Sequence, residues 1–273
     1  MKLQYLGTAA AEGTPGIFCQ CDLCVEAIKR GGKDIRTRSQ AVMDDRLLID
    51  FPPDSYWHMI RHGLNLPAME HALITHTHED HLYLNELFYR CKGFCDTRSH
   101  LTLYGNDALV RQVAIYLQQN HLTEDAARLS VVELTAFVPA RLAGYTVTPL
   151  LAAHAKNEKC FIYIIEKDGK RLLYGNDTGI FPEATWRYIK GLRFDLISLD
   201  CTHGKDREGS NHMGVPDLID IKQRLTREGN ADKDTVFVAT HFSHNGGLLH
   251  HQLEEALHPH GYLAAYDGMS VQV

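Results

Sequence analysis

The 273 residues are 44% hydrophobic and 23% charged, which is typical of a globular chain and excludes a disordered or fibrous protein. The net charge of -6 provides no overall positive field, so a nucleic-acid partner is not expected. No apolar run approaches the ~20 residues that cross a bilayer, and Met1–Tyr5 does not open a signal peptide. We therefore expect a cytoplasmic protein with no membrane partner.

Neither a Pro- or Gly-rich linker nor a repeat divides the chain, so we expect one domain over residues 1–273. Short apolar and β-branched runs predict strands at 47–49, 73–75, 101–104, 145–148, 161–165, 172–174, 196–199, 236–238 and 269–273. Asp168-Gly169 and Asp267-Gly268 are typical of tight turns, which favours antiparallel pairing in part of the sheet.

Apolar residues at helical spacing predict helices between these strands, at 54–62, 81–89, 107–119, 183–189, 216–227 and 252–257. Gly63 and Gly229 lie where helices often end. The interleaving of strands and helices predicts an α/β or α+β chain whose sheets are covered by helices.

Seventeen histidines are present, and the densest group is His76-Thr77-His78-Glu79-Asp80-His81. His76 and His78 are two residues apart, so their side chains leave an extended segment on the same side. Asp80 and His81 follow at the start of a predicted helix. Four potential ligands in six residues can serve two adjacent metals, whereas a polar loop with Asp80 as an N-cap explains only single members of the group.

Three further candidates each follow a predicted strand, namely His154, Asp177 and His241. With the six-residue motif, their order and spacing resemble the metallo-β-lactamase superfamily along almost the whole chain. The resemblance implies that family's α+β (αββα) fold, a four-layer sandwich of two mixed β-sheets covered by helices.

Carried over by position, the resemblance implies two ligand sets: His76, His78 and His154 for one metal, and Asp80, His81 and His241 for the other. Asp177 would bridge the two metals, which zinc, manganese, iron or nickel would suit. Such a pair can activate a bridging hydroxide for hydrolysis. The remaining charge of about +1 suits a small anionic phosphodiester as substrate.

Asp50 follows the run at 47–49 and resembles the carboxylate that the family places after an early strand. In that role it would orient a ligand histidine from behind, although a plain strand-end turn residue is nearly as good an interpretation.

Seven cysteines form an odd set, and three of them crowd into Cys19, Cys21 and Cys24. This spacing favours metal thiolates over disulfides. His244 is our candidate for the fourth ligand, which would close a structural zinc site with no open position for water. Three reduced core thiols are the alternative interpretation.

A narrower resemblance is to the phosphodiesterase family of the carbon–phosphorus lyase pathway, which hydrolyses a cyclic ribose phosphate. It rests on the two clusters above together with Asp177-Thr178, Asp200-Cys201-Thr202-His203, Asn211-His212, Thr240-His241-Phe242-Ser243-His244 and Asp267-Gly268-Met269. It implies that His212 acts near the phosphate by giving a proton to the leaving alkoxide. We count His212 and Asp80 as the catalytic residues, whereas the role of His203 and of residues 106–134 stays open.

The sequence thus predicts a binuclear metal phosphodiesterase for a small cyclic phosphate or nucleotide. A nuclease that processes tRNA 3′ ends, a lactone, thioester or β-lactam hydrolase, and a non-catalytic metal or redox protein are the alternatives. The acidic charge disfavours the nuclease, although Arg30, Lys33, Arg36 and Arg38 form one local basic run. Nothing in the sequence sets the oligomeric state, so a homodimer stays open.

Overall fold

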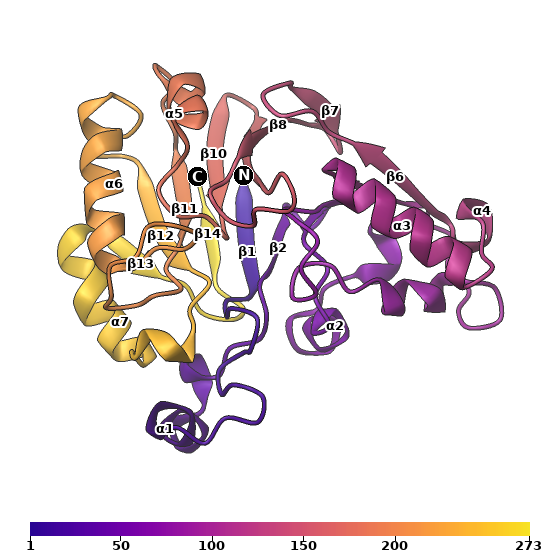
Figure 1. The fold of residues 1–273 in the computed structure, drawn as a ribbon, viewed down its shortest axis with the longest axis horizontal. Helices are drawn as coiled ribbons and strands as arrows, with labels where there is room; N and C mark the ends of the chain where they lie inside the picture. The colour runs from indigo at the N-terminus through magenta and orange to yellow at the C-terminus, as the bar shows by residue number, and fades with distance from the viewer.

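The computed structural model describes residues 1–273, and two seven-stranded β-sheets form its centre (Figure 1). The first sheet has the strand order β14-β1-β2-β3-β4-β5-β6. Its strands are β14 (Ser270–Gln272), β1 (Lys2–Gly7), β2 (Gln40–Met43), β3 (Leu47–Ile49), β4 (His71–Leu73), β5 (Leu101–Gly105) and β6 (Leu129–Glu133).

The second sheet has the order β13-β12-β11-β10-β9-β8-β7. Its strands are β13 (Tyr262–Ala264), β12 (Val236–Thr240), β11 (Leu196–Asp200), β10 (Lys170–Gly175), β9 (Phe161–Lys167), β8 (Tyr145–Leu151) and β7 (Ala140–Leu142). Each sheet is half antiparallel and half parallel, since β14 to β3 and β7 to β10 pair antiparallel and the remaining neighbours pair parallel.

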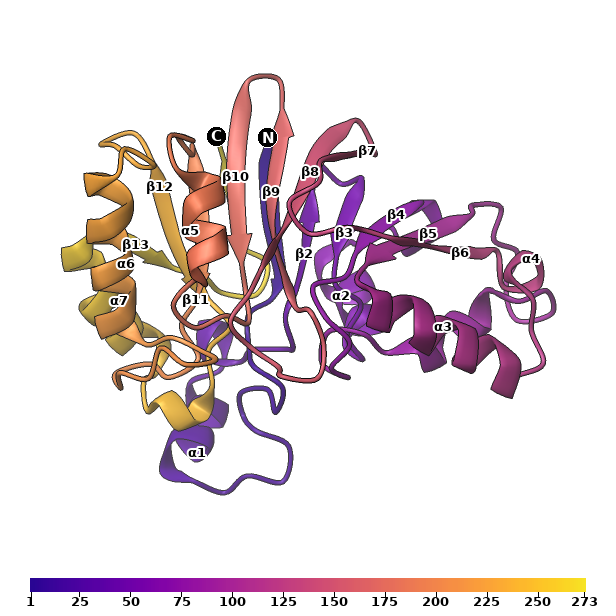
Figure 2. The same cartoon turned by 45° about the horizontal axis from the view of Figure 1, so that its top comes forward.

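Helices cover the outer faces of both sheets (Figures 1 and 2). The α-helices are α1 (Asp22–Arg30), α2 (Ser55–His62), α3 (Asp107–Gln119), α4 (Glu124–Ala127), α5 (Glu183–Ile189), α6 (Val215–Arg227) and α7 (His250–Leu257). Short 3-10 turns occupy Gly32–Asp34, Leu66–Ala68, Leu84–Arg90, His244–Gly246 and His258–His260. None of the helices combines the length and the hydrophobicity that crossing a bilayer would require.

The four-layer α+β sandwich expected from the sequence is confirmed by these layers. Strand β3 shows why the strands are apolar on both faces: Leu47 and Ile49 belong to a cluster of 45 buried residues, whereas Leu48 belongs to a second cluster of 19. Successive side chains of a strand point to opposite faces, so a sheet covered on both sides needs apolar residues throughout. The larger cluster contains the contact between the sheets, and the smaller one lies under α3.

One local prediction was wrong, and a second was right only in part. Residues 81–89 do not form an α-helix, because Leu82 bridges to Phe51 and the Tyr83 amide donates to the Phe51 carbonyl, which leaves only a 3-10 stretch at Leu84–Arg90. Asp267-Gly268 does form the predicted tight turn, in which the Met269 amide donates to the Tyr266 carbonyl, but the turn closes no hairpin because it leads from β13 in one sheet to β14 in the other. The hairpin at Asp168-Gly169 is confirmed, with β9 and β10 pairing antiparallel around it.

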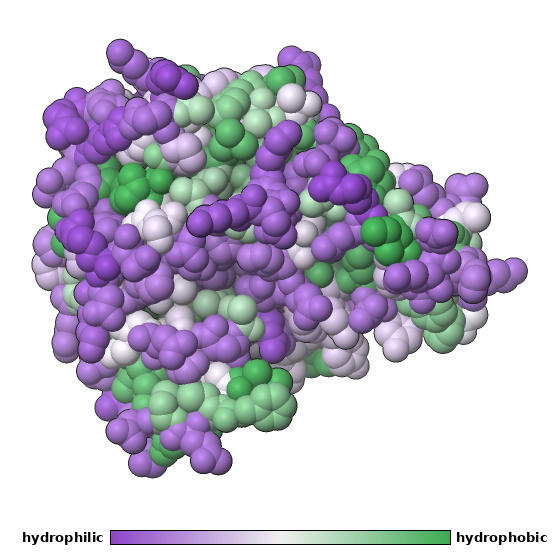
Figure 3. All heavy atoms as spheres, in the orientation of Figure 1, coloured by the Kyte–Doolittle hydropathy of each residue, from purple (hydrophilic) through white to green (hydrophobic).

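Helix α1 and the loop before it project from the lower edge of the molecule in Figure 1. Only Cys24 and Ala27 of this helix are buried. Hydrophobic residues gather on this projection in Figure 3, where the exposed ones are Ile17, Phe18, Val25 and Ile28. We call residues 11–31 the α1 lobe, and its small buried surface means that something other than apolar packing must hold it.

Candidate metal centre

His76, His78 and His154 lie together at the edge where β4 and β8 end. Nδ1 of His78 and Nε2 of His154 are 3.2 Å apart, and one nitrogen from each of the three rings lies within 4.8 Å of the others. His76 is buried and His78 is exposed, so this group opens to solvent on the His78 side.

Asp80, His81 and His241 form a second group beside the first. Nε2 of His81 lies 3.3 Å from Nε2 of His241 and 3.2 Å from Oδ2 of Asp80. Adjacent ligands at about 2.1 Å from a transition-metal ion are about 3.0 to 3.4 Å apart, so both groups have the spacing of ligands around one cation.

Asp177 lies between the two groups. Its Oδ2 atom is 2.6 Å from Nε2 of His81 and 3.2 Å from Nε2 of His241, and its Oδ1 atom is 4.0 Å from Nε2 of His154. Oδ2 is nevertheless buried without a hydrogen bond, as is Nε2 of His76. Short contacts between acceptor atoms that share no aligned proton are costly in a buried site unless a cation neutralises them. The residues present therefore fit bound metal.

Three residues of the site have a left-handed backbone at the point where a strand ends. Asp50 follows β3 with φ 65°, Asp177 follows β10 with φ 46°, and His241 follows β12 with φ 60°. This conformation is uncommon for residues other than glycine and carries local strain, which concentrates at functional sites. It turns each side chain out of the alternating strand pattern and toward the sheet edge.

The outward nitrogens of four histidines also have partners. Nδ1 of His81 lies 2.7 Å from Oδ2 of Asp50, so the predicted supporting carboxylate does contact a candidate ligand. The other partners are the Thr75 hydroxyl for His76, the Thr202 hydroxyl for His241 and the Asn211 carbonyl for His154. Such partners fix ring orientation in metal sites.

Burial by itself would lower the pKa of His81, but the surrounding carboxylates, with Asp177 the strongest, hold that pKa well above its usual value. The same acidic surroundings that favour a proton on Nε2 favour a divalent cation there. Proton and metal therefore compete for one nitrogen.

His212 lies between the two groups. Its ring centroid is 4.7 Å from that of His154 and 5.7 Å from that of His241, against which it stacks. Nδ1 of His212 lies 2.8 Å from Oδ2 of the fully buried Asp200, and the His212 side chain is 15% exposed. Burial opposes protonation of His212, but the Asp200 carboxylate outweighs it and raises its pKa to about 9.

Glu158 is a supporting residue that the sequence did not identify. Its carboxylate accepts hydrogen bonds from the backbone N–H and the hydroxyl of Thr77, and from the side-chain amide of Asn106. Asn106 in turn caps helix α3 through the Leu109 amide. The loop that carries His154 is thus tied to the loop that carries His76 and His78.

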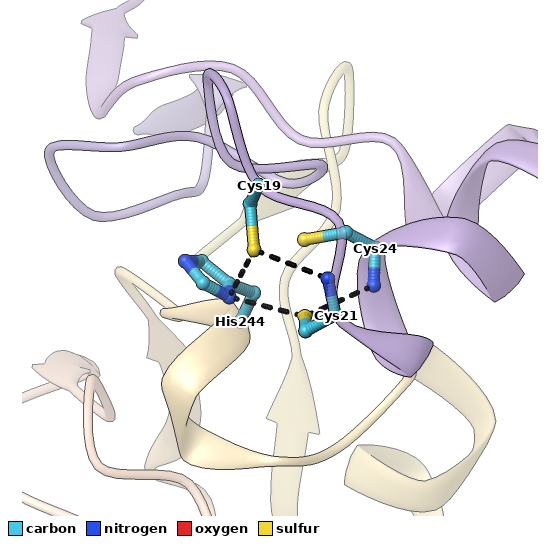
Figure 4. A group of neighbouring side chains, drawn as sticks. All are labelled: Cys19, Cys21, Cys24 and His244. Atoms are coloured by element: carbon cyan, nitrogen blue, oxygen red, sulfur yellow. Dashed lines mark hydrogen bonds between the residues drawn. The ribbon is translucent and has the colours of Figure 1, made fainter.

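Cys19, Cys21, Cys24 and His244 point toward one another at the base of the α1 lobe (Figure 4). Nδ1 of His244 lies 3.7 Å from Sγ of Cys19 and 3.6 Å from Sγ of Cys21. A tetrahedral zinc ion with Zn–S of about 2.3 Å and Zn–N of about 2.1 Å places S and N about 3.6 Å apart. A hydrogen bond from the Cys24 amide lowers the pKa of Cys21 to about 6, so one thiol is primed as thiolate.

His203 stays outside both groups. Its ring lies 5.8 Å from that of His212, and its Nε2 atom is buried without a hydrogen-bond partner. The structure thus gives His203 a place beside the site without a contact that defines a role.

Residues 45–242 match the family model of the beta-lactamase superfamily domain, so the chain belongs to the β-lactamase superfamily. Together with the His and Asp clusters, this makes it a metal-dependent hydrolase of the metallo-β-lactamase fold. Comparison with curated proteins gives no match.

Several solved structures share the fold along the whole chain. A diphosphatase of the PhnP family has 22% identity and a TM-score of 0.76, with 99% of this chain and 96% of that chain covered. Zinc-bound PqqB from Methylobacterium extorquens has 18% identity and a TM-score of 0.75, with both chains fully covered. The short form of human tRNase Z has 17% identity and a TM-score of 0.66, with 100% and 99% covered.

Proposed function

We propose that the protein is a binuclear metal phosphodiesterase that hydrolyses a small cyclic phosphate or nucleotide diester. One metal would be held by His76, His78 and His154, the other by Asp80, His81 and His241, and both by Asp177. When bound, two such cations supply an activated water and neutralise charge on phosphoryl oxygens. Zinc, manganese, iron and nickel all suit these donors.

The position of His212 carries this proposal. Hydrolysis of an aliphatic phosphodiester releases an alkoxide, which is a poor leaving group. The reaction is therefore faster when a proton donor lies beside the leaving oxygen. His212 stacks on a member of one candidate ligand group and contacts a member of the other. The Asp200 carboxylate favours its protonated form.

The reaction adds water across one P–O bond. The water oxygen forms a new bond to phosphorus, the bond to the alkoxide oxygen breaks, and His212 gives its proton to that oxygen. The proton released by the attacking water restores the imidazolium. Asp80 would help His81 and His241 hold one of the two metals, which is why we place it with His212 in catalysis.

The names of two similar structures support phosphoryl chemistry, since one is a diphosphatase and another a tRNase. The net charge of -6 favours a small substrate over a polynucleotide, because contacts to a phosphate backbone recruit many lysines and arginines.

A substrate panel tests the proposal. Protein reconstituted with zinc or with manganese is incubated with 5-phosphoribosyl 1,2-cyclic phosphate, 2′,3′-cyclic nucleotides, a nitrophenyl phosphodiester, a short RNA, a lactone and a thioester. We expect rapid opening of the cyclic phosphates. Activity on the RNA alone would identify a nuclease, and activity on the lactone or thioester alone would contradict the proposal.

The variant His212→Gln tests the proton donor, with the exposed His258→Gln as its matched control. We expect His212→Gln to lose activity on alkyl diesters by about 100-fold and to keep most activity on nitrophenyl diesters, which need no protonation. Equal losses on both substrates would overturn the role of His212 as acid.

A further inference from the structure

Two buried Asp–Thr pairs support the candidate metal centre, one from each sheet. In the first pair, Oδ1 of Asp50 lies 2.8 Å from the backbone nitrogen of Thr75 and 3.0 Å from its hydroxyl. Oδ2 of Asp50 lies 2.7 Å from Nδ1 of His81. The Thr75 oxygen is also 3.0 Å from Nδ1 of His76.

The second pair repeats this arrangement with Asp200 and Thr202. Oδ1 of Asp200 lies 3.0 Å from the backbone nitrogen of Thr202, and Oδ2 lies 3.1 Å from the Thr202 hydroxyl. Oδ2 is also 2.8 Å from Nδ1 of His212. The Thr202 oxygen is 2.8 Å from Nδ1 of His241. In both pairs, one aspartate and one threonine contact two histidines.

The chemistry of the partners fixes the direction of these hydrogen bonds. An ionised carboxylate can only accept, and a threonine hydroxyl has one proton to donate. Thr75 gives that proton to Asp50, and Thr202 gives its proton to Asp200 or to the His241 carbonyl at 3.0 Å. In every case the threonine oxygen can only accept from the adjacent histidine.

The histidine next to each threonine must therefore carry its proton on Nδ1. In the neutral ring Nε2 is then a bare lone pair, and in both His76 and His241 this atom faces the candidate metal centre. All members of both pairs are buried, so water does not replace these partners.

We propose that Thr75 and Thr202 are positioning residues that set His76 and His241 in the Nδ1–H form. Thr75 is directed by Asp50, and Thr202 is directed by Asp200 together with the His241 carbonyl. Each hydroxyl thus acts as a relay: through it, one carboxylate determines which ring nitrogen of a second histidine carries the proton. Only the consequence for catalysis rests on the proposed function, since the proton positions follow from the hydrogen bonds alone.

Nitrogen-15 NMR of the histidine rings tests the proton positions directly, in the zinc-loaded protein and in chelated protein at alkaline pH. We expect His76 and His241 to show a slowly exchanging Nδ1–H and no Nε2–H. An Nε2–H on either ring would overturn the proposal, and this measurement needs no variant and no substrate.

Variants test the relay itself. Thr202→Val and Thr75→Val keep the shape of the side chain but remove its hydroxyl. Thr→Ser at each position keeps the hydroxyl. Partners of this kind contribute about 10- to 100-fold to metal affinity, so we expect the Val variants to lose that factor in a competition titration with a zinc chelator. We expect the Ser variants to stay within about threefold of the wild type.

Thr235→Val is the matched control, because its hydroxyl bonds to the Phe194 carbonyl just before β12, at the end of that strand opposite His241. Val variants at 75 and 202 that bind zinc as tightly as this control would overturn the relay. If the NMR and affinity results hold while no diester is hydrolysed, the proposed function fails and the relay stands.

Discussion

Glu158 accepts a hydrogen bond of 3.1 Å from the backbone N–H of Thr77, 81 residues earlier in the chain. Thr77 lies between His76 and His78, and Glu158 follows His154 in the β8–β9 loop. The three histidines of one candidate metal group thus come from two loops that this carboxylate holds together. We therefore expect the spacing of these histidines to depend on Glu158, although Glu158 is not itself a candidate ligand.

We predict that Glu158→Ala weakens binding of one metal by about tenfold and leaves the fold intact, because the two loops lose their connection. The exposed Glu79→Ala in the same motif is the control. Stepwise zinc titration checks this prediction, and equal affinities in both variants would show that Glu158 does not position the group.

Asp177→Ala should give a folded chain with far less bound metal and little activity, because Asp177 contacts members of both groups. Asp177→Asn keeps the size of the side chain and tolerates the left-handed backbone, so it isolates the charge. We expect both variants to lose at least about 100-fold in activity. A metal content equal to the wild type in Asp177→Ala would refute the bridging role.

Asp44 connects the two sheets, since its Oδ2 atom accepts from the Tyr145 hydroxyl at 2.6 Å and from Lys167 at 2.9 Å. Burial by itself would raise the pKa of this carboxyl, but hydrogen bonds from Tyr145, from the Lys2 amide and from Lys167 lower it to about 2.

A folded-state pKa below the unfolded value of 3.8 means that Asp44 stabilises the fold above about pH 4, and that this contribution disappears as the pH falls toward 2. We predict that Asp44→Asn lowers the free energy of unfolding by roughly 1 to 3 kcal/mol at neutral pH. Urea unfolding at several pH values checks this. A difference between variant and wild type that persists unchanged at pH 2 would show that the Asp44 charge does not provide this stabilisation.

The α1 lobe should depend on zinc. Cys24→Ser is expected to lose one zinc per chain and to become sensitive to proteolysis within residues 11–31, because the lobe buries little apolar surface. The exposed Cys95→Ser serves as the control. Limited proteolysis with mass spectrometry identifies the site of cleavage. A lobe that is equally resistant in both variants would show that the cysteine cluster does not stabilise it.

The metal motif was predictable because its ligands follow apolar strands, and strand ends meet at a sheet edge. Glu158, Thr75 and Thr202 were not singled out, because a single threonine or glutamate has no pattern and its partner lies far away in the sequence. Asp200 appeared only within a motif, with no role attached. The left-handed backbone at Asp50, Asp177 and His241 was not predicted either, because Asp and His adopt it more often than most other residues but still only in a minority of positions.

Most strands and helices followed from periodicity, and α3 and α5 have the predicted bounds. The sequence did not predict the strands β1, β2, β6, β7 and β13 or the helices α1 and α4. Among them, the edge strands β7 and β13 have only three residues each, too few to show a period. Residues 81–89 have helical spacing, but pairing with Phe51 overrides it. The equivalent strand order of the two sheets could not be predicted from the sequence, because the corresponding segments share their topology but no repeated sequence.

Under the proposed function, this chain hydrolyses a phosphodiester by attack of water at phosphorus. The most direct test is phosphorus-31 NMR of the product formed from 5-phosphoribosyl 1,2-cyclic phosphate in water enriched in oxygen-18. The proposed function predicts one new phosphomonoester, beside the unlabelled 5-phosphate that the substrate already has, with one oxygen-18 on the new group's phosphorus. This product should be formed by the metal-loaded protein and abolished in Asp177→Ala. No turnover of the cyclic phosphate by a fully metallated protein would contradict it, as would oxygen-18 on carbon.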